Sequence, residues 1–145
     1  MESDPKEMER TIMRESIEHA IQTETIIHLI GGSDTNADTL VKEIQAATDS
    51  EEMLRIVCTP ETTTEALPSA RVPDGTLVYY KNFGELPKEV QVTAAQCVKG
   101  HFEHGLPVVV RSSEEARADL TLRNGDLRGR VRAIELNGGP NDANQ

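Results

Sequence analysis

Tryptophan is absent from the sequence, and two phenylalanines and two tyrosines are its only other large aromatic residues. Hydrophobic residues still make up 37% of the 145 residues, so the core is expected to be aliphatic. A chain of this length suits a single domain. A sequence so poor in aromatic residues has no interleaved basic and aromatic face on which a single-stranded nucleic acid could stack.

Cysteine is also scarce, with Cys58 and Cys97 far apart in the sequence. This number and spacing exclude a disulfide framework and a cysteine-based metal site, so two buried, reduced thiols are expected. No run approaches the ~18 apolar residues of a membrane span. The charged N-terminus has no apolar stretch behind it, so no signal peptide is expected either. These absences favour a cytoplasmic protein.

Basic residues are outnumbered, with 15 lysines and arginines against 25 aspartates and glutamates and a formal net charge of −10 at pH 7. A surface this acidic repels nucleic acid and anionic lipid unless basic residues cluster locally. The arginines at 123–132 form the first such cluster along the chain. Acid-rich, lysine-poor composition would fit a salt-loving host.

Apolar residues recur with helical spacing in some segments and form short runs typical of strands in others. The expected helices are 5–22, one from about Asp38, one from near Pro87 to near Gly105, a helical turn near 64–67 and a short helix from Ser113. The expected strands are 26–30, 54–58, 76–80, 107–111 and 131–136. This alternation predicts a three-layer α/β domain over 1–136, with a five-stranded, mostly parallel sheet and helices on both faces. The polar residues 137–145 are expected to form a disordered tail.

Residues 119–136 leave two structures open. Asn124 and Gly125 stand between alternating residues, which is a hairpin signal. The alternative is a helical turn followed by a strand that begins at Val131.

Four segments follow one another in an order typical of a known class of ATPases. They are SIEHAIQTETIIHLIGG at 16–32, TLVYYKNFGELP at 76–87, LPVVVRSSEE at 106–115 and DLRGRVRAIEL at 126–136. In this order they resemble the phosphate-loop, Walker B, sensor and final-strand segments of AAA+ P-loop ATPases. The nearest branch is the MoxR-like one, which includes the gas-vesicle ATPase. The resemblance implies a P-loop-NTPase-like fold, without a helical lid domain because the sequence ends just after the fifth expected strand.

The phosphate loop that the resemblance implies has lost the residues that ATP chemistry needs. Such loops follow the pattern G-x-x-x-x-G-K-[ST]. Counting from Gly31, Asn36 replaces the second glycine, Ala37 the lysine and Asp38 the hydroxyl that binds magnesium.

The Walker B position is altered as well. Lys81 and Asn82 stand where an acidic pair would hold magnesium and orient water, and Glu85 follows three residues later as a carboxylate that could compensate in part. The resemblance therefore implies a domain with no catalytic residue, no metal and no cofactor.

One feature of an anion site is retained. Free N–H groups at a helix N-terminus attract anions, although Asp34 and Asp38 oppose such binding by charge repulsion. The residues of this degenerate loop that could still contact a nucleotide are Gly31, Gly32, Ser33, Thr35 and Asn36.

Arg128 and Arg130 match the place where such ATPases present an arginine finger to a neighbouring subunit. Two interpretations remain open: a solvated basic turn that offsets the acidic surface, or a contact across a subunit boundary. His101 and His104 are one helical turn apart, as metal ligands can be, but no third ligand is apparent and both are expected at an exposed helix end. His28, in an expected strand, is interpreted as a core residue.

The sequence as a whole favours a non-catalytic, pseudo-ATPase-like interaction or regulatory module that self-associates or docks on a partner protein. Neither a membrane nor nucleic acid is the expected partner. One alternative is a binder that senses a nucleotide or phosphometabolite without hydrolysis. The other is a nucleic-acid-linked regulator that uses Arg123, Arg128, Arg130 and Arg132.

Overall fold

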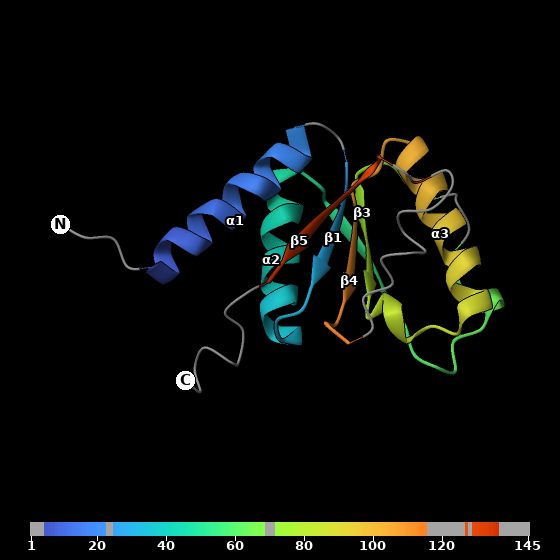
Figure 1. Cartoon of the computed structure of the whole chain (residues 1–145). Helices are drawn as coiled ribbons and strands as arrows, with labels where there is room; N and C mark the ends of the chain where they lie inside the picture. Colours follow the sequence, from blue (N-terminus) through green and yellow to red (C-terminus); the bar gives the residue numbers. More distant parts are fainter. Residues whose placement is uncertain (1–4, 23–24, 69–71, 116–126, 128, 137–145) are drawn as a thin grey trace.

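The computed structural model describes residues 5–22, 25–68, 72–115, 127 and 129–136. In this part of the chain five strands form one sheet in the order β2-β3-β4-β1-β5, and every neighbouring pair is parallel (Figure 1). The strands are β1 (Ile26–Ile30), β2 (Glu52–Val57), β3 (Thr76–Lys81), β4 (Val108–Ser112) and β5 (Val131–Glu135).

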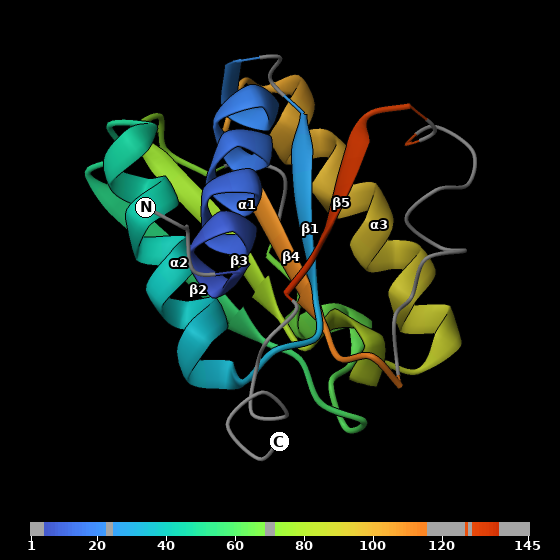
Figure 2. The same cartoon turned by 60° about the vertical axis from the view of Figure 1, so that its left-hand side comes forward.

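Helices cover both faces of the sheet. They are α1 (Pro5–Gln22), α2 (Asp34–Ala47) and α3 (Lys88–Glu103), with the 3₁₀ turns η1 (Thr64–Ala66) and η2 (Phe83–Glu85). Helices α1 and α2 lie against one face and α3 lies against the other (Figures 1 and 2). The predicted three-layer α/β architecture is confirmed, and the described sheet is wholly parallel.

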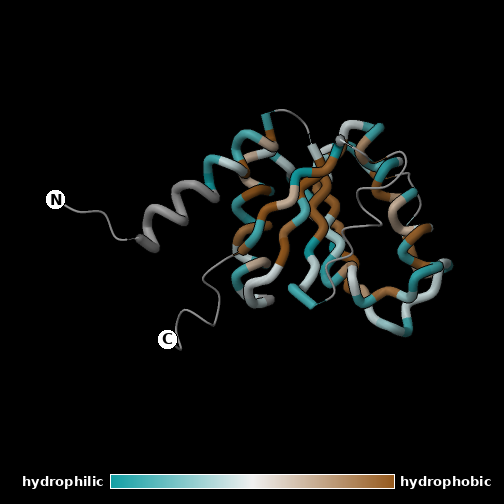
Figure 3. The backbone as a smooth tube through the Cα atoms, in the orientation of Figure 1, coloured by the Kyte–Doolittle hydropathy of each residue, from teal (hydrophilic) through white to brown (hydrophobic). Residues whose placement is uncertain are grey.

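The core has two halves, one on each face of the sheet. Along β3, Leu77 and Tyr79 pack in the half beneath α1 and α2, whereas Val78 and Tyr80 pack in the half beneath α3. The three middle strands are buried at every position, and they form the hydrophobic centre in Figure 3. Strands covered on both faces have continuous apolar sequences, which explains the short apolar runs.

Helix α2 begins one turn earlier than the sequence predicts, at Asp34 and not near Asp38. Ser33 is the reason, because its backbone is extended (φ −91°, ψ 161°) and its hydroxyl oxygen accepts a hydrogen bond from the Asn36 N–H at 3.1 Å. Serine in this position is a favourable N-cap. The loop between β1 and α2 is therefore only three residues long, from Gly31 to Ser33.

The other predicted elements agree with the structure to within two residues at most ends. Strand β5 pairs in parallel with β1. The Asn124-Gly125 hairpin lies outside the described residues and stays a prediction, whereas the strand that begins at Val131 is confirmed. Residues 113–115 form no helix, and the rest of the short helix expected there lies outside the described residues, as does the tail at 137–145. Among the described helices, none combines the length and apolar character that a membrane span requires.

Candidate functional site

The carboxyl ends of β1, β3 and β4 meet at one edge of the sheet. Gly31 follows β1, Lys81 ends β3 and Arg111 is the penultimate residue of β4. In open α/β sheets, ligands bind outside this edge. The residues that the sequence analysis compared with a phosphate loop and a Walker B motif therefore lie where such sheets bind ligands.

Asp38, in the second turn of α2, lies at the centre of a polar network at this edge. Its Oδ2 accepts hydrogen bonds from Lys81 Nζ at 3.1 Å and from Arg55 Nη2 at 3.3 Å. Its Oδ1 accepts a third from the Tyr79 hydroxyl at 3.1 Å. Arg55 and Tyr79 are partners in the β2–β3 register, so both side chains project on the α2 side of the sheet.

The network determines the ionisation of both acidic groups. Burial alone would raise the pKa of Asp38, but hydrogen bonds from Lys81 and Tyr79 and the charges of Lys81 and Arg55 outweigh it and lower the pKa below 3.8. The pKa of Tyr79 is raised, first by burial and then by the charge of Asp38. At neutral pH the network thus joins a carboxylate, a neutral phenol and two cations.

A second hydrogen-bond network, centred on Arg111, contacts the loop between β1 and α2. Arg111 is buried, and its guanidinium donates to the carbonyl oxygens of Gly31 at 3.2 Å and Gly32 at 2.8 Å. It also donates to Asn82 Oδ1 at 2.6 Å. Asn82 has a left-handed backbone (φ 63°), which turns the chain sharply after β3. The loop therefore presents carbonyl oxygens to a cation of its own chain.

Several N–H groups that would face a phosphate are already bonded within the chain. The Gly31 N–H donates to the Ser112 carbonyl at 2.8 Å, and the Asn36 N–H donates to the Ser33 hydroxyl. Gly32 has φ +68°, and a Cβ added there would lie 2.9 Å from Leu136 Cβ. Phosphate loops bind anions through such N–H groups, and the Gly31 and Asn36 N–H groups are already engaged within the chain.

The five predicted loop residues do come together in one turn, but in different roles. The carbonyls of Gly31 and Gly32 bind Arg111, Ser33 caps α2, and Thr35 and Asn36 are exposed in the first turn of the helix. Whether a nucleotide contacts them stays a prediction. Sequence reasoning missed Arg111, Tyr79 and Arg55 as partners in these networks. The available signal was a charged residue at the end of the otherwise apolar run of β4.

The structure places Arg130 at the opposite edge of the sheet, just before β5. Its guanidinium lies 5.8 Å from the centre of the Phe102 ring and 3.5 Å from Glu103 Oε2, both on α3. The Arg130 side chain is 43% exposed, so it is partly available to another molecule. Arg128 lies outside the described residues.

Three histidines that the sequence analysis singled out lie in different environments. The expectation that His101 is exposed is wrong: it is fully buried, and its Nε2 lies 3.1 Å from the Tyr80 hydroxyl. His104 is exposed, as expected, and its Nδ1 bonds to the Gly100 carbonyl at 2.7 Å. His28 is a core residue with its Nε2 2.9 Å from Ser112 Oγ. No cluster of three metal-ligating side chains exists among the described residues.

No protein-family model and no curated protein matches this chain. Solved structures of RuvB from Thermotoga maritima do match. A point variant superposes with a TM-score of 0.59 at 15% sequence identity, and a structure of the RuvB Holliday junction branch migration motor superposes with a TM-score of 0.57 at 16%. Each match covers 90% of this chain but 44% of RuvB, so the chain spans less than half of that protein. The similarity shows a P-loop-NTPase-like fold.

Proposed function

We propose that this domain is a pseudo-ATPase-like module that performs no ATP chemistry and acts by docking to a partner protein or to further copies of itself. The proposal rests on one observation above all. At the place where P-loop ATPases hold Mg²⁺ between a hydroxyl and a carboxylate, Asp38 and Lys81 form an ion pair at 3.1 Å. The motif order favours a relative of the AAA+ class, with the MoxR-like branch as the nearest pattern.

The ion pair reverses the charges of an ATPase site. Mg²⁺ requires oxygen ligands, whereas a protonated lysine offers no lone pair and repels a cation. Lys81 is 8% exposed and is held by Asp38, so its ammonium supplies internally the positive charge that a metal would bring. The site is electrostatically complete without magnesium.

Arg111 supports the same conclusion from the other side of the loop. A nucleotide phosphate could pair with this guanidinium only by displacing it from the Gly31 and Gly32 carbonyls and from Asn82. Breaking several charge-assisted hydrogen bonds of a buried arginine is costly, because each contributes about 1.5–3 kcal/mol.

The described surface offers contact points for docking. Val57, on the outer strand β2, is 54% exposed, and Val92, on α3, is 56% exposed. Arg130 presents a partly exposed cation beside α3. Arginine is enriched at protein interfaces.

The nucleotide half of the proposal is tested by thermal shift and phosphate release, with ATP and ADP, with and without Mg²⁺, at low and molar salt. We expect no hydrolysis and no shift, whereas a ligand at 100 times its dissociation constant would add about 2.7 kcal/mol of stability. The matched control is the double variant Asp38→Ser/Lys81→Asp, which restores the residue types of a metal site. Magnesium-dependent stabilisation of the unaltered protein would overturn the proposal, and stabilisation without hydrolysis would establish the sensing alternative.

The docking half is tested by light scattering and by chemical cross-linking. We expect a mass above the 15.9 kDa of one chain, or a complex with a captured protein. Val57→Lys and Val92→Lys are compared directly, because each adds one charge at an exposed valine. If only one variant loses association, the substituted valine lies in the interface, and the other variant shows that an added surface charge alone does not prevent association. A monomer that captures no protein would contradict docking.

A further inference from the structure

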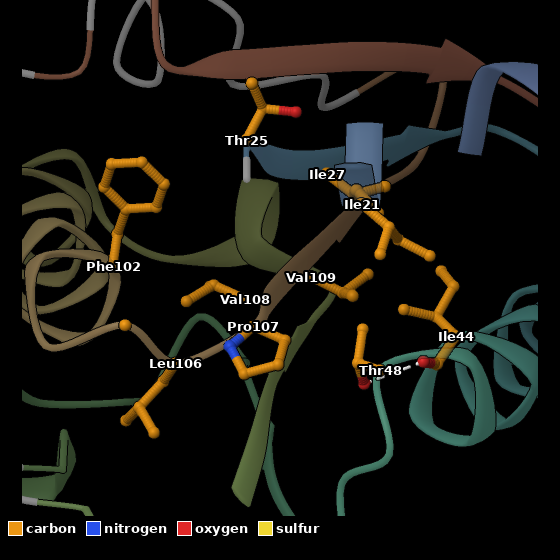
Figure 4. A pocket seen from close by; sticks show the side chains of 11 residues that line it. Ile21, Thr25, Ile27, Ile44, Thr48, Phe102, Leu106, Pro107, Val108 and Val109 are labelled. Carbon is orange, nitrogen blue, oxygen red and sulfur yellow. Dashed lines mark hydrogen bonds between the residues drawn. The ribbon is translucent and has the colours of Figure 1, made fainter. Parts of the chain in front are cut away.

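A cavity of about 360 Å³ lies at the opposite edge of the sheet, where the parallel strands begin. Its lining residues come from α1, α2, α3, β1 and β4 and from the loops next to them, and their side chains are drawn in Figure 4. Each helix contributes residues from its last turn or just beyond: Ile21 of α1, Ile44 of α2 and Phe102 of α3. The volume falls in the range of roughly 300–1,000 Å³ that is typical of small-molecule sites.

The walls of this cavity are apolar and largely fixed. Ile27 and Val109, from the adjacent strands β1 and β4, form the floor and are buried. Leu106, also buried, follows α3. No residue of the lining carries a formal charge. A ligand in this cavity would therefore gain most of its affinity from burying apolar surface.

Polar groups around the cavity are arranged to accept hydrogen bonds, not to donate them. The N–H groups of Thr25, Thr48, Gly105 and Leu106 each donate to a carbonyl of the same chain at 2.9–3.1 Å. Pro107 has no N–H.

The two threonine hydroxyls follow the same rule. Thr25 Oγ1 donates to the Ala20 carbonyl at 3.2 Å. Thr48 Oγ1 lies 2.9 Å from the Ile44 carbonyl and 2.8 Å from Ser50 Oγ, and in the second contact either hydroxyl can donate, so at least one lone pair of Thr48 is left for a ligand. A hydroxyl whose proton is engaged can still accept through its lone pairs. Thr25 and Thr48 thus offer acceptors on opposite sides of the cavity (Figure 4).

Electrostatics favour the same kind of ligand. Helices α1, α2 and α3 all end at this edge, and the C-terminal end of a helix carries partial negative charge. The chain as a whole has a net charge of −10. Both effects repel an anion and attract a cation or a hydrogen-bond donor. Arg130 is a cation beside Phe102 at this edge, but it is paired with Glu103 at 3.5 Å, so the pair adds no net charge.

From this cavity we infer a second binding site, separate from the altered nucleotide edge, for a compact apolar molecule that carries one N–H or O–H donor, or a protonated amine, and no anionic group. Apolar walls bind its body, and the Thr25 and Thr48 oxygens accept from its donor. This inference does not depend on the function proposed above, because the two sites lie at opposite edges of the sheet.

Two fluorescent probes with one skeleton test the inference on the full chain. N-phenyl-1-naphthylamine is neutral with one N–H, and 8-anilinonaphthalene-1-sulfonate has the same rings with an added anion. We expect saturable binding of the neutral probe, with an affinity at least tenfold above that of the sulfonate. Equal binding of both probes, or binding of neither, would overturn the inference.

Variants then locate the bound probe. Thr25→Val/Thr48→Val removes both acceptors and is expected to weaken binding by about three- to tenfold or more, the effect of one or two hydrogen bonds. Its matched control is Thr39→Val/Thr93→Val, since both of these helical hydroxyls likewise donate to a nearby carbonyl of the preceding turn, four residues earlier, and neither lines the cavity. Circular dichroism confirms that each variant is folded.

A filling variant gives an independent test if the threonine variant does not fold. Ile21→Phe places a ring into the half-buried mouth and should abolish saturable binding, whereas Val92→Phe on the outer face of α3 should not change it. Unchanged binding in a folded Ile21→Phe variant would show that the probe binds elsewhere and would overturn the assignment.

Discussion

Replacement of Lys81 by methionine isolates the ion pair on which the proposed function rests. Methionine preserves most of the packed stem and removes only the charge. Asp38 would then keep Arg55, which is half exposed, and Tyr79 as its partners. The effect of Lys81→Met on the free energy of unfolding therefore measures the contribution of the internal cation.

The magnitude lies between two known limits. Removing one partner of a fully buried pair costs about 3–5 kcal/mol, whereas exposed pairs contribute about 0–1 kcal/mol. The Lys81 side chain is 11% exposed and that of Asp38 is 30% exposed, and Asp38 retains two other partners. We expect a loss of about 1–2 kcal/mol, which lowers Tm by roughly 2–8 °C for a chain of this size.

Acidity provides a second signature of the same pair. Because the pKa of Asp38 is lower in the folded protein than its usual 3.8, its contribution is complete above that value and is lost as pH falls through the lowered folded pKa. In Lys81→Met the pKa of Asp38 is lowered less, so a smaller part of the stability of the protein should depend on pH below about 4.

The assay is urea unfolding, followed by circular dichroism, from pH 7 down to pH 2. Arg14→Met is the matched control, because Arg14 pairs with Glu43 at 3.8 Å on the open surface and should contribute less than about 0.5 kcal/mol. Equal stability of Lys81→Met and the unaltered protein, with the same acid dependence, would refute the reasoning.

Two further predictions concern backbone and thiols. Gly32→Ala should lower stability by about 1–3 kcal/mol in urea unfolding, because a left-handed backbone and a clash with Leu136 act together. Gly105→Ala, with φ +82° and open space around it, should cost only about 1 kcal/mol, so equal costs would contradict the packing argument. With a disulfide reagent at pH 8, Cys97 should react first and Cys58 only on unfolding, because burial raises the pKa of Cys58 to about 12 and excludes the reagent. Faster labelling of a Cys97→Ser variant than of Cys58→Ser would refute this order.

Strand and helix order could be predicted from the sequence because each middle strand is buried on both faces and therefore contains a short apolar run. The start of α2 could not be predicted, since Asn36 and Ala37 were assigned to the loop. In the structure the loop ends at Ser33, which caps the helix. The capping hydrogen bond of Ser33, and not the length of a phosphate-loop motif, thus determines where α2 begins.

The sequence predicted which residues differ from an ATPase motif at the candidate site, but it did not predict which of these residues contact one another. Lys81 and Asp38 were interpreted as replacements of metal-site residues, but their pairing appears only in the tertiary fold, which brings the end of β3 beside α2. Arg111 lies about 80 residues from the glycines it binds, and only the tertiary fold reveals such a contact. His101 was placed at an exposed helix end because spacing alone does not show which turn faces the sheet.

The two tyrosines are intrinsic spectroscopic probes of the two sides of the sheet. They are consecutive in the sequence but project to opposite faces of β3, where the hydroxyl of Tyr79 bonds to α2 and that of Tyr80 lies within hydrogen-bond distance of α3. With no tryptophan present, near-ultraviolet signals of the folded chain come mainly from these two rings. A Tyr79→Phe variant would lose the tyrosine signal from the α2 side of the sheet, and a Tyr80→Phe variant would lose that from the α3 side. The loosening of either helical layer could then be followed separately during unfolding or binding.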